Sequence, residues 1–408
     1  MKFLFVHQNY PAQYQHLIMH LLARGGHDIV FISEANDNTI VGVRRAMYRS
    51  DPGKPEFVHS SAQDLDRAVR RAEQVAAAAA NQKRLGFTPD IVIGHHGWGE
   101  LLNLQDVFPG VPILGYFEFY YWADGQDVAF DPEFPADPAH RPRIRAMNVI
   151  NHLAYAMGEP GQTPTEWQLT RYPEWMRPGI EILPEGARLD ICRPDPAAKT
   201  KELDLDGFKV APGEKLVTYV ARNLEPYRGV HTMIRALPEL MRARPDLKVV
   251  MVGGDDASYG ARCANGTWRE HFMKEIAGRY DPARLLMPGQ VSYPTYLRLL
   301  QRSDAHVYLT YPFVASWSLR EALAAGCVVI GADVDSVREF VTHNRNGLLT
   351  PCLDPARLAE QVLGVLEDRK LSDRLRAGAR RYAEKHLDMK LHLAAYAKRI
   401  QQLTGQKI

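Results

Sequence analysis

The feature that most constrains the fold is an alternation of short apolar runs with helical patterns, and it occurs twice along the chain. The first set opens with an apolar run at residues 3–6, a helical pattern at 14–23 and a second apolar run at 29–32. Short runs that are apolar throughout are typical of parallel strands buried on both faces of a sheet. The alternation therefore predicts a doubly wound α/β architecture.

A second set of the same units begins near residue 215. Between the two sets, residues 188–213 are rich in Asp, Lys and Pro, which is typical of a linker. We therefore expect two Rossmann-like lobes with parallel sheets and a cleft between them that binds the ligand. The expected boundaries are residues 1–195 for the first lobe, 196–387 for the second, and 388–408 for a last helix that crosses back to the first lobe.

Composition and charge exclude several classes of protein. The 408 residues carry 50 basic and 48 acidic side chains, so no large basic field marks a nucleic-acid binder. The longest apolar run, residues 322–332, is far shorter than the ~18 residues of a membrane span, which leaves only peripheral membrane contact. Four scattered cysteines without a CxxC pair and an early polar N-terminus predict a cytoplasmic protein.

The loop after the predicted strand at 305–309 is the first candidate site. A helix that starts near Ser316 to Ser318 would point backbone N–H groups and a positive dipole end at an anion such as phosphate. Either serine could instead only cap the helix. Glu321 is expected in the first turn, where a carboxylate either compensates the helix dipole or accepts hydrogen bonds from a ribose.

Two arginines form the second candidate site. Arg222 and Arg228 flank a Pro-containing turn directly after the predicted strand at 216–220. The guanidinium group presents a rigid fork of donors that matches phosphate oxygens. Arginines are also common on surfaces, and only a position that faces the start of the Glu321 helix favours a phosphate site.

The first lobe offers two further candidate loops. His95 follows the strand at 91–93, where it could bind a sugar hydroxyl, exchange protons or merely cap the next helix. The tandem His95-His96 pair lacks a third ligand at matching spacing, so we expect no metal site. Aromatic residues next to polar groups suit sugar rings, although core packing or a partner interface would also explain them. The loops at 7–11 and 116–122 supply the expected acceptor-binding residues Asn9, Tyr10, Glu118 and Tyr120.

Over nearly its whole length the chain resembles the retaining glycosyltransferases of the GT-B fold, specifically family 4. The first-lobe motifs HQNYPAQY and GHHGWGE are similar to those of a bacterial subgroup. A phosphate-binding P-loop, a GxGxxG turn and a GxSxG elbow are all missing, which disfavours the enzymes that carry them. The segments of best resemblance are residues 94–100, 182–194, 220–229, 249–254, 288–293 and 310–350.

The resemblance implies a role for each candidate residue. Glu321 matches the second glutamate of the E-x7-E motif, which binds the nucleotide ribose, and Val291 matches the region that meets the nucleobase. Arg222 and Arg228 resemble the basic pair that neutralises the diphosphate, and His95 matches a histidine near the donor sugar. These three residues are the expected catalytic groups.

The stretch before Glu321 both follows and departs from the family pattern. Ser316, Trp317 and Ser318 match the residues whose backbone holds the diphosphate and the donor sugar. Phe313 stands where the motif has its first glutamate, so recognition of the donor sugar must differ.

The resemblance implies a retaining, metal-independent hexosyltransferase without a cofactor, using a UDP- or GDP-linked sugar. It implies a glycan or lipid-linked acceptor in bacterial polysaccharide, glycolipid or glycoconjugate assembly. The alternatives are a GT-B phosphorylase or epimerase, or a non-catalytic nucleotide-sugar-binding protein.

Overall fold

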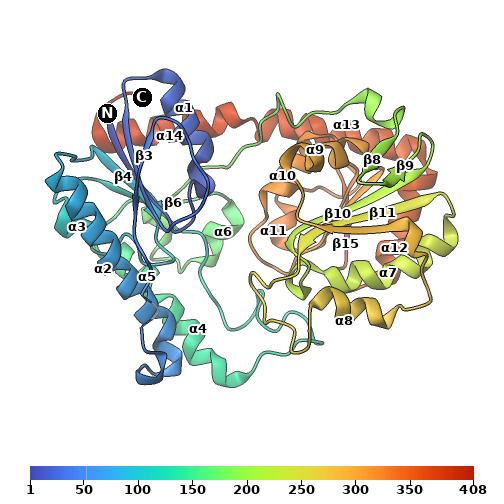
Figure 1. The fold of residues 1–408 in the computed structure, drawn as a ribbon, viewed down its shortest axis with the longest axis horizontal. Helices are drawn as coiled ribbons and strands as arrows, with labels where there is room; N and C mark the ends of the chain where they lie inside the picture. Colours follow the sequence, from blue (N-terminus) through green and yellow to red (C-terminus); the bar gives the residue numbers. More distant parts are fainter. Residues whose placement is uncertain (52) are drawn as a thin grey trace. The chain divides into compact units, whose positions relative to one another are not determined.

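The computed structural model describes residues 1–51 and 53–408 and divides into two compact units (Figure 1). Unit 1 comprises Met1–Ala129, Pro135–Glu185 and Lys390–Ile408, and unit 2 comprises Phe130–Phe134 and Gly186–Met389. The division after Glu185 lies ten residues before the boundary expected from the sequence. The short segment Phe130–Phe134 leaves unit 1, packs within unit 2 and returns, which the sequence did not indicate.

Unit 1 is built on a seven-stranded sheet of order β3-β2-β1-β4-β5-β6-β7, in which every neighbouring pair is parallel. Its strands are β1 (Lys2–Val6), β2 (Asp28–Ser33), β3 (Val43–Met47), β4 (Ile91–His95), β5 (Ile113–Tyr116), β6 (Gly161–Thr163) and β7 (Ile180–Ile182). Its helices are α1 (Gln15–Arg24), α2 (Gln63–Arg84), α3 (Leu104–Val107), α4 (Arg141–Met147), α5 (Val149–Ala156), α6 (Glu166–Arg171) and α14 (Met389–Thr404).

Both faces of this sheet are covered, as the apolar runs predicted. Phe3 and Phe5 pack on one face with residues of α1 and of the last helix α14, while Leu4 and Val6 pack on the other face with α2. The alternation follows from the two-residue period of a strand. Tyr396 of α14 is buried in the first of these clusters, so the last helix is part of the core of unit 1.

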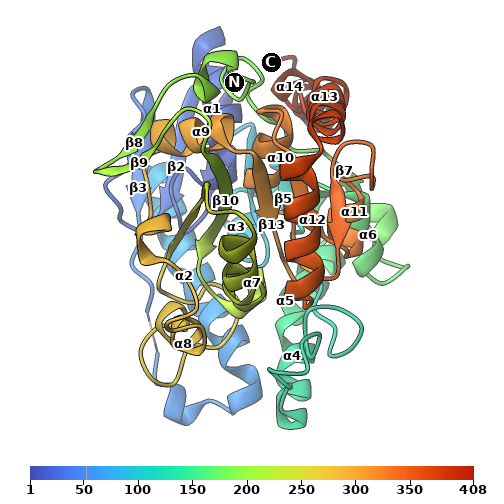
Figure 2. The ribbon, with the colours of Figure 1, turned by 90° about the vertical axis from the view of Figure 1, so that its right-hand side faces the viewer.

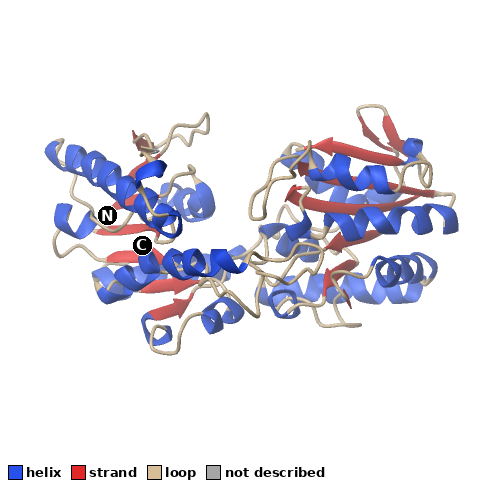
Figure 3. Ribbon diagram, turned by 90° about the horizontal axis from the view of Figure 1, so that it is seen from below, coloured by secondary structure: helices blue, strands red, loops and turns tan. Residues whose placement is uncertain are grey.

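Unit 2 contains a six-stranded parallel sheet of order β12-β11-β10-β13-β14-β15 and a separate hairpin β8-β9. Helices lie on both faces of the sheet (Figure 3), and α7 packs against α12 (Figure 2). Its strands are β8 (Leu203–Leu205), β9 (Phe208–Val210), β10 (Lys215–Asn223), β11 (Leu247–Gly254), β12 (Leu285–Gly289), β13 (Ala305–Tyr308), β14 (Val329–Ala332) and β15 (Leu348–Thr350). Its helices are α7 (Val230–Ala243), α8 (Trp268–Glu275), α9 (Tyr293–Arg302), α10 (Trp317–Ala324), α11 (Asp335–Arg338), α12 (Pro355–Glu367) and α13 (Arg369–His386).

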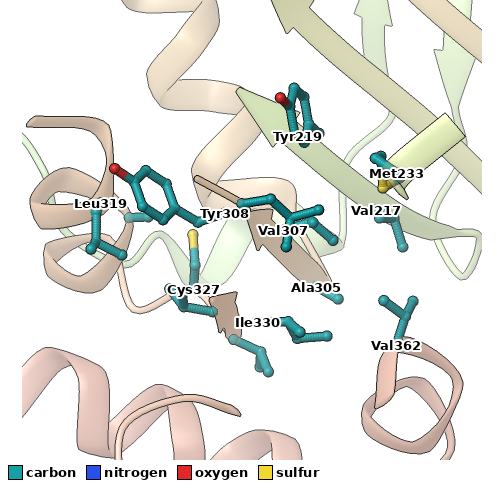
Figure 4. Packing of buried hydrophobic residues seen from close by; sticks show 14 of the residues in the cluster. Val217, Tyr219, Met233, Ala305, Val307, Tyr308, Leu319, Cys327, Ile330 and Val362 are labelled. Atoms are coloured by element: carbon teal, nitrogen blue, oxygen red, sulfur yellow. The ribbon is translucent and has the colours of Figure 1, made fainter. Parts of the chain in front are cut away.

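The core of unit 2 is an aliphatic layer between the central strands and their helices. Figure 4 shows Val217 and Val307 from neighbouring strands, with Met233 and Val362 from the helices that cover them. All four side chains are fully buried. The ring of Tyr308 extends from the end of β13 towards the helix that carries Leu319 (Figure 4). Its hydroxyl accepts a hydrogen bond from the Ser316 N–H, which belongs to the candidate site described below.

The segment 188–213, whose composition is typical of a linker, contains regular structure in its second half. Residues 203–210 form the hairpin β8-β9, whose apolar residues join a core cluster with β10 and β11. Asp206 and Gly207 make its two-residue turn, both with positive φ (51° and 95°). An Asp-Gly pair between apolar residues is a known hairpin signal, although the surrounding polar composition is typical of a linker.

Across residues 1–51 and 53–408, no helix is long and apolar enough to span a membrane.

Candidate functional site

The candidate site in unit 2 lies at the carboxyl edge of its sheet. Because all six strands are parallel, the loops that follow β10, β11, β12 and β13 emerge at the same edge. Ligands of open α/β sheets bind at this edge. The loop after β10 carries Arg228, and the loop after β13 runs through Phe313 to the start of α10.

Arg228 is the central charged group of this site. Its side chain is buried, with 7% of the residue exposed, and Nη1 donates to Thr310 Oγ1 (3.0 Å) and to the Val314 carbonyl (3.3 Å). Burial lowers the pKa of this guanidinium, but nearby phenolic and carboxyl groups, led by Tyr308, outweigh it and raise the pKa above its usual value. The Val314 carbonyl that Arg228 contacts lies two residues before Ser316, the N-cap residue of α10. The structure thus holds a permanent cation close to the start of that helix.

The turn after Arg228 requires a glycine. Gly229 has φ +68°, and a Cβ there would lie 2.5 Å from Leu309 Cβ. This close approach joins the loop after β10 to the end of β13 and so brings Arg228 against Thr310.

Phe313, which replaces the first motif glutamate, belongs to an aromatic cluster around the Arg228 cation. Its ring packs on Tyr259 (centroids 4.7 Å apart) and on Tyr227 (5.2 Å). The Arg228 guanidinium lies over the rings of Tyr259 (4.9 Å) and Phe313 (5.8 Å). The aromatic faces therefore contact the cation through their quadrupoles at a position where the family motif has a carboxylate.

The start of α10 has few backbone donors engaged within the helix. Ser316 is at the N-cap position, but its side chain makes no capping hydrogen bond. Instead its N–H donates to the Tyr308 hydroxyl (2.8 Å), and its Oγ lies 2.6 Å from Ser318 Oγ. The simple capping interpretation of Ser316 is therefore wrong. The Leu319 N–H donates to the Ser316 carbonyl (3.2 Å). The first N–H groups of a helix otherwise have no acceptor in an earlier turn of the same helix.

Glu321 lies one turn further along the helix than the sequence suggested, because α10 begins at Trp317 and has no acidic residue in its first turn. Its two carboxylate oxygens accept hydrogen bonds from Tyr293 Oη (2.7 Å) and Tyr296 Oη (2.9 Å). Burial raises its pKa above the usual value, although the two hydroxyls oppose that shift. The Cys192 thiol lies 3.8 Å away, and burial raises its pKa to about 12.

The other predicted donor-site residues make fewer contacts with the rest of the candidate site. Arg222 is exposed, and no hydrogen bond or ion pair of its side chain is found in the described part of the chain. Val291 is half-buried and packs against the two core clusters of unit 2. Of the two arginines, the structure thus brings only Arg228 into contact with the segment before α10.

In unit 1, His95 is buried and both its ring nitrogens are engaged. The Gly97 N–H donates to Nδ1 (3.0 Å), so the proton of the neutral ring is on Nε2, which lies 3.2 Å from Glu118 Oε2. The Glu118 carboxylate is 38% exposed and is the outward end of this pair. The group that solvent can reach here is therefore the Glu118 carboxylate, which the imidazole N–H of His95 orients.

The remaining acceptor-loop residues divide between surface and core. Asn9 is exposed. Tyr10 is buried with its ring edge-to-face on Phe31, and Tyr120 is buried with its hydroxyl 2.9 Å from His152 Nε2. For these two tyrosines the structure matches the alternative of core packing that the sequence left open.

Two buried carboxylates that shape the loops were missed by sequence reasoning. Glu225 Oε2 accepts three consecutive backbone N–H groups of the loop after β11, at residues 258–260 (3.0–3.2 Å). In unit 1, Glu100 accepts the Gln8 N–H (3.1 Å) and the Tyr48 hydroxyl (3.3 Å). A single glutamate in a loop gives no local signal of either role, because its partners lie far away in the sequence.

The segment Phe130–Phe134 also contacts this part of unit 2. Asp131 Oδ2 accepts the Tyr311 hydroxyl (2.6 Å) and lies 3.0 Å from His231 Nε2, while the Phe130 ring packs on Tyr311. Ligand atoms of Asp131, Glu133 and His231 come within 4.8 Å of one another, as at a metal site. Both Glu133 oxygens already bind Arg235 (2.7 Å each), so a cation here would compete with a guanidinium.

Comparisons with protein families match each unit to glycosyltransferases. Residues 25–192 match the family described as glycosyl transferase family 4 group, and residues 202–382 match glycosyl transferases group 1. Both lobes have the parallel α/β architecture of GT-B glycosyltransferase structures. The amino-terminal part of the chain is therefore similar to the family 4 group, the carboxyl-terminal part is similar to the group 1 glycosyl transferases, and the fold is the GT-B fold.

Individual relatives share part or all of the chain. A phosphatidyl-myo-inositol mannosyltransferase of Mycolicibacterium smegmatis is 32% identical over 179 residues, which are 43% of this chain and 40% of that protein. A D-inositol 3-phosphate glycosyltransferase of Nocardia farcinica is 31% identical over 49% of this chain and 42% of its own length. The chain thus spans less than half the length of these two relatives, whereas a Mycobacterium tuberculosis glycogen synthase is 23% identical over 93% of this chain and 89% of its own.

Solved structures resemble the whole chain in fold. Sucrose-phosphate synthase from Thermosynechococcus elongatus has a TM-score of 0.74 at 17% identity and covers 99% of both chains. Anabaena Alr3699/HepE in complex with UDP and glucose has a TM-score of 0.67 at 16% identity, covering 98% of this chain and all of the other.

Proposed function

We propose that this protein transfers a sugar from a nucleoside diphosphate sugar to an acceptor hydroxyl, with retention at the anomeric carbon and without a metal ion. The single observation that carries the proposal is the buried guanidinium of Arg228 beside the start of α10. This cation and the helix N–H groups provide positive charge at the strand edge where α/β folds bind nucleotides.

The difficult step of such a reaction is departure of the nucleoside diphosphate, on which negative charge grows as the glycosidic bond breaks. Preorganised donors aimed at that charge stabilise the transition state without reorganising. Arg228 is preorganised because Thr310 and Val314 hold it and two aromatic rings pack against it. We propose that it binds the diphosphate together with the positive dipole end at the start of α10.

Glu321 is proposed to bind the ribose of the donor. Its oxygens are held by the Tyr293 and Tyr296 hydroxyls, and Oε2, which the Cys192 thiol does not contact, has a further lone pair for a ribose hydroxyl. Val291, in the loop before α9, is proposed to meet the nucleobase through its backbone. Phe313 replaces a carboxylate with an apolar ring, so the donor sugar is recognised there without a charged acceptor of hydrogen bonds.

The acceptor is proposed to bind at unit 1, where Glu118 presents a carboxylate to solvent and His95 orients it. Such a carboxylate can accept a hydrogen bond from a sugar hydroxyl. The proton of the attacking hydroxyl is proposed to pass to an oxygen of the leaving diphosphate, on the same face of the sugar, which gives retention. A UDP-linked donor is favoured by the similarity in fold to HepE, which was crystallised with UDP and with UDP-glucose.

The test is a thermal-shift screen with UDP, GDP, ADP and TDP and their common sugar conjugates. A specific nucleotide raises the melting temperature by mass action, by an amount that grows with its concentration over Kd. Arg228→Met should strongly reduce the shift, whereas Arg222→Met should retain most of it. If no nucleotide stabilises the protein, the proposal is wrong. Consumption of free phosphate or interconversion of the sugar without an acceptor would instead favour a phosphorylase or an epimerase.

A further inference from the structure

Unit 1 contains a pocket that none of the predicted site residues lines. It has a volume of about 410 Å³ and lies between the loop that follows β5 and the segment that follows α6. This volume is within the range of small-molecule sites, about 300 to 1,000 Å³. The lining residues that the argument uses are Trp122, Gln126, Thr170, Arg171, Glu174 and Arg177.

The tryptophan of the pocket is exposed but held in place. Trp122 is 43% exposed, and its indole Nε1 donates to the Arg171 carbonyl (2.7 Å). The ring of Tyr120 packs against it with centroids 5.2 Å apart. An aromatic ring that is fixed on one side and open on the other offers a flat apolar face to a ligand at little cost in conformational entropy.

The amide of Gln126 is the second observation that points to a ligand. Only 3% of this residue is exposed, and neither its Oε1 nor its Nε2 has a hydrogen-bond partner in the described residues. A buried amide without hydrogen-bond partners is destabilising, and native proteins rarely leave one unsatisfied. A rotation of this side chain towards the pocket would let ligand hydroxyls supply both the donor and the acceptor that it lacks.

The charges around the pocket are mixed. Arg177 is held by the carbonyls of Tyr172 (2.8 Å) and Thr170 (3.0 Å), and Glu174 lies on the same rim. Cations and carboxylates side by side disfavour an anionic ligand such as a phosphate or an acidic lipid headgroup. They suit a neutral ligand that both donates and accepts hydrogen bonds.

We propose that this pocket binds one or two neutral sugar units of the acceptor glycan, with a sugar ring stacked on Trp122 and its hydroxyls on Gln126. The inference rests on the proposed function, because it identifies the acceptor as a carbohydrate that extends beyond the hydroxyl receiving the new sugar. Sugar rings combine an apolar C–H face with a rim of hydroxyls, and the pocket combines an aromatic face with an amide and a polar rim.

The experiment measures sugar binding without turnover. Saturation-transfer difference NMR is recorded on the full chain with millimolar methyl glycosides of glucose, galactose, mannose and N-acetylglucosamine. Three variants are compared with the wild type: Trp122→Ala, Gln126→Ala and Trp175→Ala. Trp175 is the matched control, since it is 55% exposed but does not line the pocket.

At least one glycoside should show saturation transfer, and Trp122→Ala should weaken its binding about fivefold to tenfold, as expected for loss of one aromatic contact. Gln126→Ala should also weaken it, Trp175→Ala should not, and added UDP should not displace the sugar. The inference is overturned if no glycoside binds, or if Trp122→Ala binds as well as the wild type. It is also overturned if Trp122→Ala instead abolishes binding to phosphatidylglycerol vesicles, since the tryptophan would then be a membrane contact.

The nucleotide screen separates this inference from the proposed function. Sugar binding without any nucleotide binding would leave the pocket intact and reject the transferase. Nucleotide binding without sugar binding would reject the sugar-binding pocket and leave the proposed transferase intact.

Discussion

Replacement of Arg228 by methionine tests both the packing and the electrostatics of the unit 2 site. Methionine keeps most of the buried aliphatic volume but removes the cation. It leaves the buried Thr310 Oγ1 and the partly buried Val314 carbonyl without this donor, at about 1–3 kcal/mol for the hydroxyl and less for the carbonyl. It also removes the contacts with Tyr259 and Phe313, worth about 1–2 kcal/mol in a desolvated setting.

An opposing effect limits the loss of stability. The wild-type protein bears the cost of burying a cation, and methionine relieves it. We therefore expect the free energy of unfolding of unit 2 to fall by about 2–4 kcal/mol, below the simple sum of the lost contacts. The loss of a charged donor to phosphate should weaken UDP binding by about 10- to 100-fold.

The assays are urea unfolding followed by circular dichroism, and calorimetric titration with UDP. Arg222→Met is the control, because Arg222 is exposed, and its stability should stay within about 0.5 kcal/mol of the wild type. The reasoning fails if Arg228→Met unfolds at the same urea concentration as the control. It also fails if both variants bind UDP equally well.

Three further predictions concern single groups. Glu225→Gln should lower stability by about 1–3 kcal/mol and speed hydrogen exchange of the three amides that it holds in the loop after β11, and unchanged exchange would contradict this role. Burial lowers the pKa of His306 to about 4 from 6.5, so the unfolded state binds its proton more tightly. Stability should therefore fall by up to roughly 3 kcal/mol as the pH drops from 6.5 to 4, and His306→Gln should flatten that slope in urea titrations. Asp131→Asn should weaken UDP binding several-fold, because Asp131 accepts the hydrogen bond of the Tyr311 hydroxyl in the loop before α10. Wild-type affinity in this variant would show that Asp131 does not contribute to the nucleotide site.

Much of the architecture could be predicted from local patterns. The strands at 3–6, 29–32 and 91–93 and the helix at 14–23 lie within two residues of the observed elements. These segments are apolar or amphipathic over their whole length, so the sequence of each one carries its own structural signal. Short strands such as β3 and β6 were missed because they mix charged, small or polar residues.

The candidate site divides along the same line. The sequence shows that charged and aromatic residues follow the strands. It also shows that Phe313 replaces a glutamate of the family motif. The partners of those residues were not visible. His95 faces Glu118, and Glu321 lies between two tyrosines, because chain folding brings together groups 23 to 28 residues apart.

The sequence by itself determined that the chain forms two parallel α/β units and that its polar loops gather at their strand ends, because hydrophobic periodicity acts over a few neighbouring residues. Only the tertiary structure decided that Phe130–Phe134 packs within unit 2 and that Asp131 accepts the hydroxyl of Tyr311, 180 residues away. Such contacts depend on how whole elements pack, and no local pattern encodes them.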